Sequence, residues 1–85
     1  MSFSPTEFRK ELAELRLPKG RFARAINVNA TYVSEYLSGL RVPTDEVTRR
    51  ILFVFTFIRE HQMTGAGFAL DAAGIRLLQK KIKDM

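Results

Sequence analysis

The sequence predicts an all-α fold of four to five helices that form one small domain. Apolar residues recur at intervals of three and four along most of the chain, and residues that commonly cap or end helices stand between these stretches. The length of 85 residues, of which 46% are hydrophobic, allows one folded domain but not two.

The first helix is predicted from its capping residues. Ser4 and Glu7 have the S-x-x-E spacing of a capping box, in which each side chain accepts a hydrogen bond from the other residue's backbone N–H. Phe3 and Phe8 have the spacing of a hydrophobic staple, and Pro18 ends the helix near residue 16 or 17. The apolar stripe of this helix consists of Phe8, Leu12 and Leu15.

Two short helices joined by a tight turn follow. The second is expected over about residues 19–26, and Asn27 then tolerates the left-handed conformation that ends a helix sharply. Asn29 caps a third helix that runs to about Leu37, and Gly39 closes it. The residues expected to face inward are Phe22, Ala23, Ile26, Val33, Tyr36 and Leu37.

The fourth helix, expected over about residues 45–62 with Thr44 as its cap, is unusually apolar. Its segment ILFVFTFI is also compatible with a strand, but the flanking DEVTRR and REHQ extend the helical pattern beyond strand length. Phe53 and Phe57 form a second apolar stripe, which needs a cover other than the core. The first stripe, which faces the core, consists of Val47, Ile51, Val54, Phe55 and Ile58.

A last helix is expected after the TGAG turn at residues 64–67, with Asp71 as its cap, although Gly74 disfavours it. We predict that residues 1–62 form the main unit. Residues 63–85 are then a C-terminal extension that belongs to the same domain or serves in dimerisation. The apolar side of the last helix consists of Ala72, Ile75, Leu78 and Ile82, and Lys80, Lys81 and Lys83 lie on another side.

Composition excludes several classes of protein. The absence of cysteine excludes disulfide staples and thiolate zinc sites, and the single histidine, His61, disfavours a His-rich metal centre. Neither a catalytic set nor a Gly-rich phosphate loop is present, so we expect no enzymatic activity and no metal, cofactor or small-molecule ligand. No apolar run approaches the roughly 20 residues of a membrane span, and the N-terminus lacks a secretory pattern, which together predict a cytoplasmic protein.

Positive charge is concentrated in one part of the chain. The net charge is +5, and residues 16–41 contribute +4 of it, since Glu35 is the only acidic residue there. This concentration indicates an anionic partner. A solvated basic face is the alternative interpretation.

The second and third predicted helices lie in this basic stretch and meet the requirements of a helix-turn-helix, whose second helix enters the DNA major groove. The small residue Ala23 stands where the two helices cross, and Asn27 permits the turn. The outward positions Asn29, Thr31 and Ser34 are polar and short enough to approach bases.

Residues 19–43, KGRFARAINVNATYVSEYLSGLRVP, resemble the lambda-repressor-like (Cro/cI, or XRE) helix-turn-helix family. The most specific part is VSEYLSGLRVPT, because Gly39 and Pro43 stand at the family's spacing from the third helix. Asn27 replaces the usual turn glycine, and Leu37 replaces a frequent polar residue. The resemblance covers the first four helices and does not extend to the last one.

The resemblance implies two sets of DNA contacts. Thr31 is then expected to touch a phosphate or a thymine methyl group, and Glu35 to accept a hydrogen bond from a cytosine N4 amine. An ordinary surface role is the alternative for Tyr32 and Glu35. The family's base-reading positions fall on Asn29, Ala30, Thr31, Tyr32, Ser34 and Glu35. Its phosphate-binding positions fall on Lys19, Arg21, Ser38, the N–H of Gly39, and Arg41.

One such module reads only a few base pairs, which favours a homodimer on a palindromic operator with half-sites about one helical turn apart. Packing of the C-terminal extension onto its own fourth helix is the alternative use of the same apolar residues, and the two arrangements are compatible. The candidate dimer interface consists of Phe53, Phe57, Phe68, Leu70, Ile75 and Leu78.

Together these expectations describe a sequence-specific, double-stranded DNA-binding transcriptional regulator, most simply a homodimeric repressor of phage or mobile-element type. A DNA-binding antitoxin of a toxin–antitoxin pair is an alternative. A helical protein-interaction adaptor that has lost DNA binding is a rival from another class, but an adaptor does not need the charge of +4 in residues 16–41.

Overall fold

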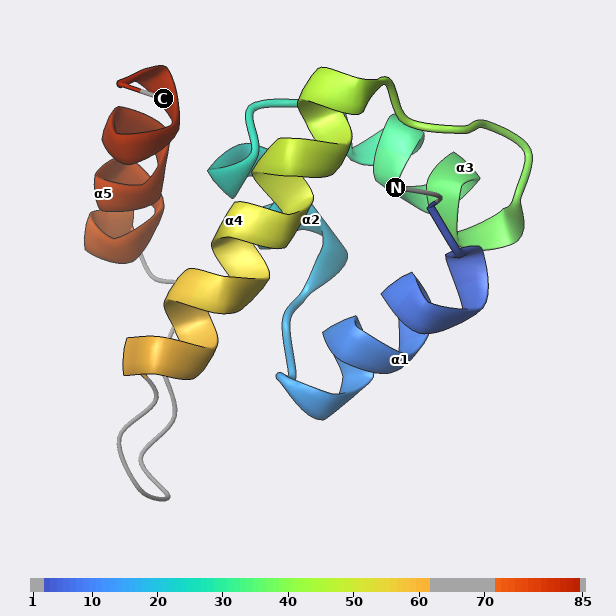
Figure 1. Cartoon of the computed structure of the whole chain (residues 1–85), viewed down its shortest axis with the longest axis horizontal. Coiled ribbons are helices and arrows are strands. Elements are labelled where there is room, and N and C mark those ends of the chain that lie inside the picture. Colours follow the sequence, from blue (N-terminus) through green and yellow to red (C-terminus); the bar gives the residue numbers. More distant parts are fainter. Residues whose placement is uncertain (1–2, 62–71, 85) are drawn as a thin grey trace.

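The computed structural model describes residues 3–61 and 72–84, which contain five helices and no strand. In Figure 1, α4 runs through the middle of the molecule, with α1 and α3 on one side of it and α5 on the other. The expected all-α class is therefore confirmed for the described residues. The helices are α1 (Pro5–Glu14), α2 (Lys19–Ala25), α3 (Ala30–Ser38), α4 (Asp45–His61) and α5 (Ala72–Lys83).

The start of α1 is held by the predicted contacts. The backbone N–H of Glu7 donates to Oγ of Ser4 at 3.3 Å, which is one half of the capping box. The rings of Phe3 and Phe8 meet edge to face with their centroids 5.4 Å apart, which is the hydrophobic staple. These two contacts fix the angle at which the chain enters α1.

The end of α1 comes earlier than Pro18 alone predicts. The helix ends at Glu14, and Arg16 takes a left-handed conformation with φ of 53°. The N–H of Leu17 then donates to the carbonyl of Leu12 at 2.9 Å, which is the hydrogen bond of a Schellman motif. The expected end near residue 16 or 17 was therefore wrong, because a left-handed cap at an arginine stops the helix first.

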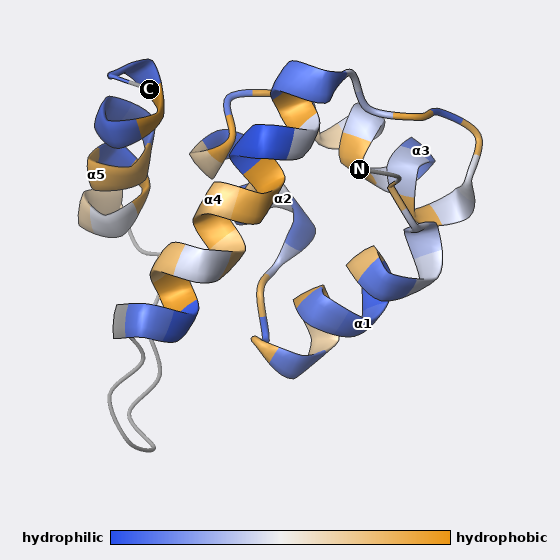
Figure 2. Cartoon of the chain, viewed as in Figure 1, coloured by the Kyte–Doolittle hydropathy of each residue, from blue (hydrophilic) through white to orange (hydrophobic). Residues whose placement is uncertain are grey.

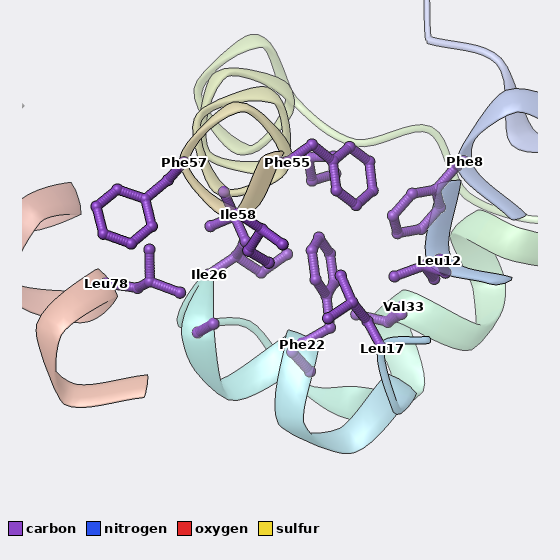
Figure 3. Close-up of a cluster of buried hydrophobic side chains, with 14 of the residues drawn as sticks. Phe8, Leu12, Leu17, Phe22, Ile26, Val33, Phe55, Phe57, Ile58 and Leu78 are labelled. Atoms are coloured by element: carbon purple, nitrogen blue, oxygen red, sulfur yellow. The ribbon is translucent and has the colours of Figure 1, made fainter. Parts of the chain in front are cut away.

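One hydrophobic cluster joins all five helices (Figure 3). The Phe22 ring of α2 stacks on the Phe55 ring of α4 with centroids 5.3 Å apart, and Phe8 of α1 contacts both rings. The predicted inward residues of α1–α4 are buried, with three exceptions. Leu15, Leu37 and Val47 are only partly buried.

The described part of the C-terminal extension packs on the rest of the chain. Leu78 of α5 is fully buried, and it and Phe57 of α4 point toward each other in Figure 3. Gln79 Nε2 donates to the carbonyl of Arg24 at 2.7 Å, which ties α5 to the last turn of α2. The arrangement matches the alternative in which the extension covers its own fourth helix.

This packing changes what the expected dimer interface can contribute. Phe57, Ile75 and Leu78 are buried within one chain, whereas Phe53 is only partly buried. The expected interface residues Phe68 and Leu70 lie outside the described residues, as do the TGAG turn and the expected cap Asp71.

Candidate nucleic-acid interface

The turn between α2 and α3 has the conformation that the sequence predicts. Asn27 lies in the left-handed region with φ of 59°, and the N–H of Val28 donates to the carbonyl of Ala23 at 2.9 Å. The side chain of Ala23 is buried, and α2 packs against α3. The turn that joins α2 to α3 is therefore closed by its own backbone.

The first turn of α3 presents short side chains to solvent. Oδ1 of Asn29 accepts a hydrogen bond from the N–H of Thr31 at 2.8 Å, so this side chain caps the helix. Behind them, Val33 and Tyr36 are buried and fix the rotation of α3. The base-reading candidates exposed on the outer face are Asn29, Ala30, Thr31, Tyr32 and Ser34, and Glu35 is half-buried.

The outer face of α3 also carries a charged cluster that the sequence did not reveal. Arg41, in the loop after α3, places its guanidinium carbon 4.2 Å from the centre of the Tyr32 ring. Nε of Arg41 donates to Oε1 of Glu35 at 3.2 Å. Arg41, which the resemblance assigns to phosphate binding, thus contacts Tyr32 and Glu35, which the resemblance assigns to base reading.

The C-terminal end of α3 uses the polar groups expected to bind phosphate. Gly39 takes φ of 82°, and its N–H donates to the carbonyl of Tyr36 at 3.4 Å. Oγ of Ser38 donates to the carbonyl of Glu35 at 3.1 Å. Both candidate donors therefore have partners within the chain, whereas Lys19 and Arg21 are exposed on α2.

Three side chains from α1, α4 and α5 donate to carbonyl groups at the C-terminal ends of α2 and α3. Arg9 Nη2 of α1 donates to the carbonyl of Leu37 at 2.6 Å, and Arg50 Nη1 of α4 donates to the carbonyl of Ile26 at 3.2 Å. Gln79 of α5 is the third, through the bond to Arg24 described above. Donors at the carbonyl ends of α2 and α3 satisfy groups that a helix cannot pair internally. Sequence reasoning missed these residues, since their acceptors lie 24 to 55 positions away in the chain.

Residues 3–61 and 72–84 lack two other features that would indicate a function. No group of three or more histidine, cysteine or acidic side chains is placed to hold a metal ion. Within the same ranges, none of the helices combines the length and apolar character needed to cross a membrane.

Comparison of the chain with protein-family models, with curated proteins and with solved structures finds no match.

Proposed function

We propose that this protein binds double-stranded DNA and places the N-terminal half of α3 in the major groove. The single observation that carries the proposal is the exposed row of short side chains on α3, together with exposed cations before it on α2 and after it in the next loop. Lys19 and Arg21 stand on α2, and Arg41 stands beyond the end of α3. The one acidic residue of this surface, Glu35, is already paired with Arg41.

Each part of the surface has a distinct role in this proposal. The cations of α2 bind phosphates and set the register of the protein on the duplex, without reading the sequence. Thr31 and Ser34 reach base edges by hydrogen bonds, and Ala30 offers apolar contact to a thymine methyl group. Specificity then rests on few hydrogen bonds, since Asn29 is used as a cap and Arg41 covers Tyr32 and Glu35.

Such a module fits a transcriptional regulator that acts by occupying an operator. One α3 helix covers only a few base pairs, so useful discrimination against the rest of a genome requires a second copy on the other half of a palindromic site. We therefore propose a homodimeric repressor of the phage or mobile-element type. Helix α5 supports this arrangement by packing on α2 and α4 and stabilising them.

The proposal is tested by fluorescence anisotropy of labelled duplexes, followed by selection of bound duplexes from a random pool. We expect binding that weakens steeply with salt, and a selected consensus with two-fold symmetry. Arg21→Ala should weaken binding, whereas Arg76→Ala removes the same charge from α5, on the far side of α4 from α3 (Figure 1), and should leave binding nearly unchanged. An absence of binding even at low ionic strength would exclude the proposal and favour the adaptor.

A further inference from the structure

The outer face of α4 keeps an apolar groove even after α5 has packed against the helix. The groove has a volume of about 370 Å³, and Leu52, one of its lining residues, is 38% exposed. Figure 2 shows hydrophobic residues concentrated in the middle of α4 and hydrophilic ones at both of its ends. The residues that line the groove are Arg49, Leu52, Phe53, Thr56, Phe57 and Glu60.

The two ends of this groove carry opposite charges. Arg49 and Glu60 are exposed, and neither has an ion-pair partner in the part of the chain that the structure describes. They lie eleven positions apart, which is about 16 Å along a helix, so they are too distant to pair with each other in one chain. The groove is thus apolar at its centre, positive at one end and negative at the other.

From this pattern we infer that the face binds a second copy of the same chain, with the two α4 helices antiparallel. A two-fold axis through the middle of the groove brings Arg49 of each copy to Glu60 of the other. The same axis sets Phe53 against Thr56 of the second copy, and Leu52 against its Phe57. Both charges of the face are then paired by one symmetric operation, as an isologous interface requires.

The apolar surface available to such a dimer extends beyond the groove. Leu52 also borders a second apolar cleft of about 140 Å³ between α1 and α4, whose lining includes Phe3 and Phe55. An interface that consists of one helix pair and the edge of this cleft is small. We therefore expect a dissociation constant of the dimer in the micromolar range.

This face is separate from the surface proposed to bind DNA. None of the residues that line the groove belongs to α2, α3 or the loop after α3. It shares Phe53 and the edge of the largely buried Phe57 with the interface expected from the sequence, but not Ile75 and Leu78, which are buried in the core of one chain. Association through α4 can therefore be measured without DNA, and its failure would leave the α3 proposal standing.

The experiment is sedimentation equilibrium of the full chain without DNA, over about 1 to 200 µM, with charge exchange as the test. We expect the apparent mass of the wild-type protein to rise from 9.7 kDa toward twice that value. Arg49→Glu and Glu60→Arg each place two like-charged pairs at the interface and should weaken association at least about tenfold. The double variant R49E/E60R recreates both pairs in reverse and should restore association to within about threefold of wild type.

A matched control and the thermal stability of each variant complete the experiment. Arg76→Glu changes the net charge as Arg49→Glu does, but on α5, and should leave association unchanged. Thermal unfolding confirms that every variant folds. Glu60→Arg is additionally favourable for the helix itself, since it places a cation in the last turn of α4. The inference is overturned if the wild-type protein stays monomeric at every concentration measured. It is also overturned if neither Arg49→Glu nor Glu60→Arg weakens the association.

Discussion

Arg41 follows the C-terminal end of α3 in the chain, and its guanidinium carbon lies 4.2 Å from the centre of the Tyr32 ring. From the same position Arg41 donates a hydrogen bond to the Glu35 carboxylate at 3.2 Å. The loop after α3 therefore covers part of the outer face of this helix with a cation and neutralises its one carboxylate. If this surface binds DNA as proposed, we expect Arg41 to influence which groups of α3 are available to bases.

Replacement of Arg41 should differ in kind from replacement of Arg21. Arg21→Ala removes an exposed cation of α2, so it should weaken binding to all duplexes by a similar factor and lower the salt slope by about 1. Arg41→Ala should weaken binding and also change the preferred sequence, because it frees Glu35 and Tyr32. Selection from a random duplex pool with each variant measures this difference. Identical consensus sequences for both variants would show that the cluster has no influence on base recognition.

The N-cap of α3 separates stability from DNA affinity. Asn29→Ala removes the bond to the N–H of Thr31 and should lower the free energy of unfolding by about 1 kcal/mol. Asn29→Asp keeps the cap and should retain stability, but it brings a carboxylate toward the phosphates and should weaken DNA binding about tenfold. Urea unfolding and duplex titration measure the two quantities. If Asn29→Asp binds DNA as tightly as the wild type, the start of α3 does not approach the duplex.

Local signals in the sequence predicted the helix caps and the turn between α2 and α3 well. The left-handed conformations at Asn27 and Gly39 and the caps at Ser4, Asn29 and Thr44 depend on residues within a few positions, and all five are present. Arg16 is the counterexample, because an arginine carries no local preference for the left-handed conformation that ends α1. Element types and most boundaries were therefore accessible to sequence reasoning.

Contacts between distant parts of the chain were not predictable in the same way. The periodicity of α4 showed that Phe57 needs a cover, but an apolar stripe does not specify whether α5 or a second copy supplies it. The bond from Arg9 to the Leu37 carbonyl and the position of Arg41 over Tyr32 depend on how helices and loops cross in space. In the candidate site, the sequence thus indicated which residues are exposed but not which of them contact one another. The DNA-contacting roles of these residues stay predictions.

The C-terminal helix should behave as part of the core. Leu78→Ala empties a fully buried position between α5 and the rest of the chain, and it should lower the free energy of unfolding by about 2–5 kcal/mol. Leu77→Ala is the matched control. Leu77 is the neighbour of Leu78 on the same helix but is 43% exposed, so its truncation should cost about 0.5 kcal/mol or less. Denaturant titrations followed by circular dichroism measure both values. Equal, small effects of the two variants would mean that α5 is not docked in solution.

Alkaline pH should destabilise the protein partly through Tyr36. Burial raises the pKa of the Tyr36 hydroxyl above its usual 10.0, with Glu35 and Tyr32 adding to this effect and Arg41 opposing it. Because the folded state holds this proton more tightly than the unfolded state, the contribution of the neutral phenol is complete below pH 10 and declines as the pH rises above that value. Tyr36→Phe has no phenol to ionise, so the stability of the wild type relative to this variant should decrease above pH 10. The unfolding free energy of each protein is measured between pH 8 and 11, and the value for Tyr36→Phe is subtracted from that of the wild type. Contributions from groups that titrate alike in both proteins cancel in this difference. A relative stability that stays constant, or increases, with pH contradicts the expected direction.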